Sequence, residues 1–127
     1  MGKIFLFTGS ILGMLGVAVG AFGAHGLQKI LLAHNRVETF ETAVKYHFYH
    51  GLALLVLGLF LYIKPTNLYL IWSGYLFIAG VIIFSGSLYI LSLTNVKWWG
   101  AVTPVGGIVF ILGWLFLAWG CLKSSTG

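Results

Sequence analysis

The sequence contains no aspartate, a single cysteine and only two acidic residues, Glu38 and Glu41. Without aspartate the chain has no Ser-His-Asp triad, and the lone Cys121 excludes an internal disulfide or a CxxC redox pair. Phosphate-binding loops, dinucleotide-binding fingerprints and zinc-protease motifs are also absent from the sequence. These absences leave no recognisable catalytic residue, so the sequence favours a protein that is not an enzyme.

Charged side chains are scarce, at 7% of the 127 residues, compared with about 25% in a typical soluble domain. Apolar residues make up 60%, more than a soluble domain of this size buries. The seven Lys and Arg are scattered singly, unlike the clustered basic face of a nucleic-acid-binding protein. Single basic residues between apolar runs are typical of membrane proteins. The composition therefore predicts a multi-pass protein of the cell membrane that contacts lipids and binds no nucleic acid.

Four uncharged runs predict an all-α bundle of four transmembrane helices, with residues 1–127 as one domain. The runs cover residues 4–24, 47–63, 68–93 and 102–122. Each approaches or exceeds the ~20 helical residues that cross about 30 Å of bilayer hydrocarbon. Thr66 or Asn67 is a candidate N-cap for the third helix, and Pro104 is tolerated in the first turn of the fourth. Because no charged residue lies within a run, we do not expect a charged ion relay or a proton-coupled multidrug pump.

Residues 26–46, between the first two runs, carry five of the nine charged side chains. Apolar residues recur there at three- and four-residue steps, which predicts an amphipathic connector at the membrane interface. Asn35 and Glu38 resemble a capping box, so we expect a helix to begin at Arg36 and continue into the second span. The orientation of the bundle in the membrane stays open, because the predicted topology places three basic residues on one side of the membrane and four on the other, too similar for the positive-inside rule to decide.

Glycine spacing predicts close contacts between helices. Eighteen glycines would weaken soluble helices, but between membrane helices they allow the backbones to approach. They follow helical faces, in steps of four and three in the first run and of seven in the second and fourth. The residues are Gly9, Gly13, Gly16 and Gly20, then Gly51 and Gly58, then Gly106, Gly113 and Gly120. We expect all nine to face other helices, so that leucine at Gly13 or Gly113 would force helices apart.

Four ordered segments resemble the signature segments of the domain-of-unknown-function family DUF423. They are GAFGAHG at residues 20–26, TFETAVKYHFYH at 39–50, FSGSLY at 84–89 and TPVGG at 103–107. This family includes bacterial YgdD- and YwdK-like proteins and the eukaryotic transmembrane protein 256. The resemblance covers nearly the whole chain and implies a multi-pass membrane protein without an established activity. It also implies that position 47 is often Gln, so that His50 is the better candidate for a role shared in the family.

The candidate site is a polar cluster of five residues: His25, Glu41, Lys45, His47 and His50. The end of the first predicted span and the start of the second lie on one side of the membrane, so these residues can meet there. Glu41 and Lys45 have the favourable i, i+4 order for an ion pair. We expect a network from Glu41 to Lys45, with His25 beside Lys45 or His50.

The same histidines admit two interpretations. They can ligate a metal or haem, or they can hydrogen-bond to backbone at helix ends. We favour the second interpretation and expect neither metal nor cofactor, because the chain lacks a further acid or thiolate cluster. His34 is interpreted as a surface residue. We expect hydroxyl groups in the third span and before the fourth to bond back to carbonyls of their own helices; they belong to Ser85, Ser87, Thr94 and Thr103.

Two functional hypotheses follow. The first is a non-enzymatic protein that binds lipid, a membrane-protein partner or a second copy through the connector and the adjacent end of the bundle. The second is a haem-, metal- or quinone-linked redox component that uses His25 and His50.

Overall fold

The computed structural model describes residues 1–124, and every regular element within them is a helix. The elements are α1 (Gly2–His25), α2 (Gln28–His34), α3 (Val37–Ile63), α4 (Leu68–Gly80), the π-helix η1 (Val81–Ser85), α5 (Gly86–Thr94), the 3-10 helix η2 (Lys97–Ala101) and α6 (Thr103–Ser124). Because α4, η1 and α5 follow without a break, four segments are long and apolar enough to cross a membrane. The prediction of an all-α fold with four spans is confirmed.

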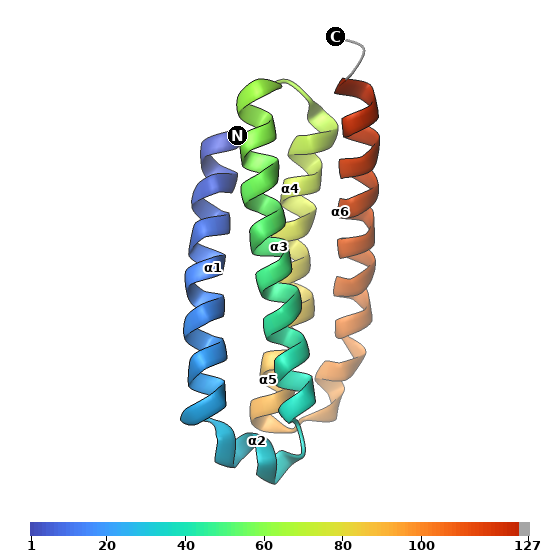
Figure 1. Ribbon diagram of the computed structural model, residues 1–127. Helices are drawn as coiled ribbons and strands as arrows, with labels where there is room; N and C mark the ends of the chain where they lie inside the picture. The colour runs from blue at the N-terminus through green and yellow to red at the C-terminus, as the bar shows by residue number, and fades with distance from the viewer. Residues whose placement is uncertain (125–127) are drawn as a thin grey trace.

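The long helices lie side by side, with α3 between the others (Figure 1). α1 packs mainly against α3, whereas α6 packs mainly against α4 and η1. Met1, the turn from α3 to α4 and the last turn of α6 lie at one end of the molecule, and α2 lies at the other (Figure 1). The core between α1, α3, α4 and α6 is apolar and consists of Phe5, Leu54, Leu57, Leu61, Leu70, Phe77, Val81 and Phe110.

The connector differs in part from the prediction. We expected a helix to start at Arg36, and α3 begins one residue later, at Val37, with Arg36 as its N-cap. The helix has 27 residues, which correspond to about 40 Å of rise. The predicted capping box is wrong, because Asn35 ends α2 in the left-handed conformation and the Arg36 N-cap receives no side-chain hydrogen bond. Asparagine tolerates positive φ better than most residues, which suits it to a helix end. The helix that connects the first two spans is therefore the short α2, and residues 37–46 belong to α3.

The third span contains a π-turn that its uniform apolar sequence did not predict. The predicted N-cap of this span is confirmed at Asn67, whose side chain accepts a hydrogen bond from the Leu70 backbone N–H at 3.2 Å. Ser85, at the end of η1, donates to the Ala43 carbonyl of α3 at 2.8 Å. The prediction that Ser85 bonds within its own helix is thus wrong, because the hydroxyl turns toward α3. The hydroxyl groups of Ser87, Thr94 and Thr103 do bond to carbonyls three or four residues earlier in the chain.

The glycines of α1 and α3 lie where the two backbones touch. A methyl group at Gly9 would lie 2.8 Å from the Gly51 carbonyl oxygen, and one at Gly58 would lie 2.9 Å from that of Gly2. The buried glycines of α1 recur every seven residues, at Gly2, Gly9, Gly16 and Gly23. The prediction for Gly13 is wrong, because a methyl group there would meet no atom within 4 Å. Gly13 lies about 40° around the helix from Gly9, away from the line of contact. At Gly20 the methyl group would lie 3.3 Å from Val44.

The glycines of α6 lie in close contact with the third span. A methyl group at Gly106 would lie 2.5 Å from the backbone nitrogen of Phe84. One at Gly113 would lie 2.7 Å from the ring of Phe77, and one at Gly120 would lie 2.8 Å from the Leu70 side chain. Both sets of residues recur every seven positions, as antiparallel helices in a left-handed bundle require. Gly74 and Gly80, which the spacing did not single out, receive the rings of Phe5 and Phe110 in the same way.

Candidate functional site

His50 lies buried near the middle of α3, with 3% of its surface exposed. Its Nδ1 lies 2.7 Å from the Tyr46 carbonyl oxygen, and the indole N–H of Trp114 donates to its Nε2 at 3.0 Å. Because an indole nitrogen only donates, Nε2 is the acceptor and Nδ1 carries the proton. The ring also stacks on Phe110, with centroids 3.7 Å apart. Both nitrogens of His50 are therefore occupied by the protein, which leaves neither free for a ligand.

His47 is also buried and links three helices. Its Nε2 lies 2.8 Å from the Leu12 carbonyl oxygen of α1, and its Nδ1 lies 2.8 Å from the Tyr89 hydroxyl of α5. Since a carbonyl only accepts, Nε2 carries the proton in the neutral ring, and Tyr89 donates to Nδ1. The bond to the Leu12 carbonyl joins α1 to α3. His47 thus helps to hold α1 against the rest of the molecule.

His25 does not join these histidines. It ends α1, is exposed and forms no described hydrogen bond or ion pair. His47 contacts α1 at Leu12, which lies about 20 Å of helix rise from His25, and His50 is more distant still. The expected meeting of His25 with His50 is therefore wrong: Gly23, near the end of α1, packs against Phe40, ten residues before His50, so His50 lies deep in the bundle rather than beside the end of α1. Within the described residues, no group of three His, Cys, Asp or Glu side chains is placed to hold a metal ion.

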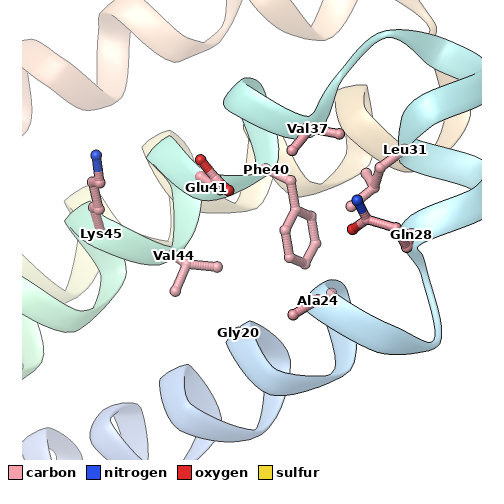
Figure 2. A pocket seen from close by; sticks show the side chains of 10 residues that line it. Gly20, Ala24, Gln28, Leu31, Val37, Phe40, Glu41, Val44 and Lys45 are labelled. Carbon is pink, nitrogen blue, oxygen red and sulfur yellow. The ribbon is translucent and has the colours of Figure 1, made fainter.

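Glu41 and Lys45 are exposed, and no ion pair forms between them. Their side chains project from the same side of α3, facing away from Phe40 and Val44 (Figure 2). The predicted network from Glu41 through Lys45 to a histidine is therefore not formed. An exposed i, i+4 pair contributes only a few tenths of a kcal/mol, about 0.3 to 0.5, too little to hold two long side chains in one geometry.

Glu41 and Lys45 instead stand at the edge of a pocket between α1, α2 and α3 (Figure 2). Its volume is about 240 Å³. The residues that line it are Gly20, Gly23, Ala24, Gln28, Leu31, Val37, Phe40, Glu41, Val44 and Lys45. The pocket exists because the α1 side is built from small residues while α2 crosses the end of the helix pair. Its floor is apolar and its polar side chains come from α2 and α3.

Two hydrogen bonds between distant segments were missing from the sequence interpretation. His34, taken for a plain surface residue, donates from Nδ1 to the Ser92 carbonyl at 3.0 Å, which corrects that interpretation. The Arg36 guanidinium donates to the Asn95 side chain at 3.1 Å. Together these two bonds fasten α2 and the start of α3 to the end of α5. The partners lie 58 and 59 residues apart in the chain, so local spacing carries no signal for them.

A second groove, of about 470 Å³, lies on the other side of α1 toward α5. Its lining is almost entirely apolar: Ala18, Val19, Phe22, Leu27, Phe40, Tyr89 and Leu93. Phe40 borders both the groove and the pocket. Because the groove lacks charged residues, only the pocket combines an apolar floor with opposite charges at its edge.

The comparisons with known proteins point to membrane proteins. Residues 19–107 match the family described as "Protein of unknown function (DUF423)". A UPF0382 membrane protein of Staphylococcus aureus is 47% identical over 91% of this chain and 92% of its own length. The UPF0382 membrane protein of Staphylococcus epidermidis is 46% identical over 97% and 98%, and the UPF0382 membrane protein YwdK of Bacillus subtilis is 41% identical over 95% and 98%. No solved structure matches the chain.

Proposed function

The chain belongs to the DUF423 family of membrane proteins, and from that premise we propose that it is a non-enzymatic protein that binds a membrane lipid. The binding site is the pocket between α1, α2 and α3. The observation that carries the proposal is the pocket's division into an apolar floor and a charged edge, which matches the division of a lipid into acyl chain and headgroup.

The position of the pocket along α3 supports this assignment. Lys45 is the last charged residue before the uncharged run that ends at Ile63. Its side chain therefore lies near the boundary where basic residues extend toward headgroups. The floor residue Val44 faces α1 at that depth, and Phe40 faces α1 about 6 Å of rise closer to α2 (Figure 2). A lipid that lies along α3 brings its polar part to Lys45 and the start of its chain to Val44.

We also propose that the protein resides in the cell membrane. The four candidate spans and the bacterial relatives that are named membrane proteins support it.

The redox hypothesis has less support from the geometry. It required His25 and His50 to share a ligand, yet they lie far apart along the bundle. The ring nitrogens of His50 already bond to Tyr46 and Trp114. A haem or metal would have to displace a hydrogen bond from a buried, closely packed ring, which costs roughly 1–3 kcal/mol.

Native mass spectrometry of protein extracted in a mild detergent tests the lipid proposal. Ala24 lines the pocket and is exposed, so Ala24→Trp fills the pocket without disturbing the core. We expect the parent to retain a phospholipid through gentle activation and Ala24→Trp to lose it.

Ala118→Trp is the matched control, because Ala118 is exposed on α6 and does not line the pocket. It should retain lipid as the parent does. Equal retention by the two tryptophan variants, or no retained lipid on the parent, contradicts the proposal.

A further inference from the structure

The edge of the pocket carries one negative and one positive group without a partner. Glu41 and Lys45 are one helical turn apart in an order that suits pairing, yet they do not pair. Neither side chain forms a hydrogen bond or ion pair with any other described residue. Both line the pocket at its edge and project from one side of α3, away from the floor residues Phe40 and Val44 (Figure 2). A carboxylate and an ammonium are thus both available to the same bound molecule.

This pair of charges discriminates between headgroups. A purely anionic headgroup would be attracted by Lys45 but repelled by Glu41 about 6 Å of rise away. A purely cationic amphiphile would be attracted by Glu41 but repelled by Lys45. A zwitterionic headgroup satisfies both residues, with its phosphate at the Lys45 ammonium and its amine at the Glu41 carboxylate.

The type of amine follows from the groups that line the pocket. A primary ammonium donates charge-assisted hydrogen bonds to a carboxylate, whereas the quaternary ammonium of choline has no N–H to donate. Choline sites are instead built from aromatic cages. Phe40 is the only aromatic residue in the lining, and one ring does not make a cage. The Gln28 amide on α2 adds a further donor and acceptor.

We infer that the pocket selects a zwitterionic phospholipid with a primary amine, of the phosphatidylethanolamine class. The inference rests on the proposed function and adds the headgroup: Lys45 binds the phosphate, Glu41, one turn closer to α2, binds the ammonium, and the acyl chain runs past Val44 toward the middle of the bundle.

Competition in native mass spectrometry tests the headgroup. Delipidated parent protein is mixed with equal amounts of phosphatidylethanolamine, phosphatidylcholine and phosphatidylglycerol that carry identical acyl chains. We expect the phosphatidylethanolamine adduct to exceed each of the others about threefold to tenfold, as partly exposed charge-assisted hydrogen bonds allow. Glu41→Gln should abolish this preference, and Lys45→Gln should weaken all three adducts. Glu38→Gln is the matched control, since Glu38 is exposed on the same helix outside the pocket, and it should behave as the parent.

The outcomes separate this inference from the proposed function. If the three lipids bind equally, or if phosphatidylglycerol is preferred, the headgroup inference is wrong, and the lipid site itself stands as long as Ala24→Trp still removes the adducts. If the parent binds none of the three, both ideas fail. Free phosphoethanolamine in excess should leave the adducts unchanged, because it lacks the acyl chain. Displacement by this small molecule would contradict a lipid as the occupant.

Discussion

At the residue scale, two buried histidines explain how polar groups are satisfied inside an apolar bundle. His47 and His50 each have both ring nitrogens bonded, and every buried side-chain N or O within the described residues has a partner. In lipid an unsatisfied group has no water to replace a lost hydrogen bond. Removing one partner should therefore cost more than removing an exposed polar group of the same kind.

The first prediction concerns Trp114. Trp114→Phe keeps an aromatic ring beside Phe77 and His50 but leaves Nε2 of His50 without a donor. We expect a loss of about 1–3 kcal/mol in unfolding free energy, measured by thermal or denaturant unfolding in detergent. Trp72→Phe is the control, because the Trp72 side chain is 57% exposed and should tolerate the change. Equal stability of the two variants would show that the bond to His50 contributes nothing.

The second prediction concerns the pair of His47 and Tyr89. His47→Leu leaves the Tyr89 hydroxyl without its acceptor, and Tyr89→Phe leaves Nδ1 of His47 without its donor. Each change should destabilise the protein by about 1–3 kcal/mol. The double variant should lose less than the sum of the two, because neither group is then left alone. Additive losses in the same unfolding measurement would contradict a direct interaction.

The sequence could place these histidines on α3 but not identify their partners. His47 and Tyr89 are 42 residues apart, and His50 and Trp114 are 64 apart. Periodicity along one helix carries no information about which residues of another helix lie at the same depth. The site was therefore assigned to the end of the bundle, whereas two of its five residues lie in the interior. Glu41 and Lys45 were identified correctly as neighbours on one face, but the pocket beside them depends on how α2 crosses α1 and α3.

At the element scale, helix extents were largely predictable because hydropathy alone decides which runs can cross a membrane. The π-turn at Val81–Ser85 could not be predicted in this way, because contacts with other helices lie at its two ends. Gly80 receives Phe110, and Ser85 reaches the Ala43 carbonyl. A uniformly apolar sequence gives no sign of either contact.

The third prediction separates two glycines of α1. Gly9→Ala puts a methyl group 2.8 Å from the Gly51 carbonyl oxygen, where nothing but backbone can yield. We expect α1 to be pushed from α3, with a loss of roughly 1–3 kcal/mol. Gly13→Ala places its methyl group in open space and should be neutral or slightly stabilising, because alanine favours the helix. Thermal stability in detergent distinguishes the two, and equal losses would show that the contact line on α1 is assigned wrongly.

At the scale of the whole molecule, α1 stands apart from the other long helices. It packs mainly on α3 and has a pocket on one side and an apolar groove on the other. Glycine contacts and the His47 bond hold it in place. This arrangement leaves two recesses beside α1, and only one of the two presents charges beside an apolar floor. The account of function depends on that one pocket being occupied by lipid.

The most direct test is to map where a lipid contacts the protein. A phosphatidylethanolamine with a photoactivatable group in its acyl chain is incorporated into membranes containing the full chain, and the cross-linked peptides are identified by mass spectrometry. The account predicts cross-links concentrated on residues 20–31 and 37–45, and their loss in Ala24→Trp. Cross-links spread evenly over the exposed apolar surface of α6, at residues such as Ile108 and Leu115, and unaffected by Ala24→Trp, would contradict it.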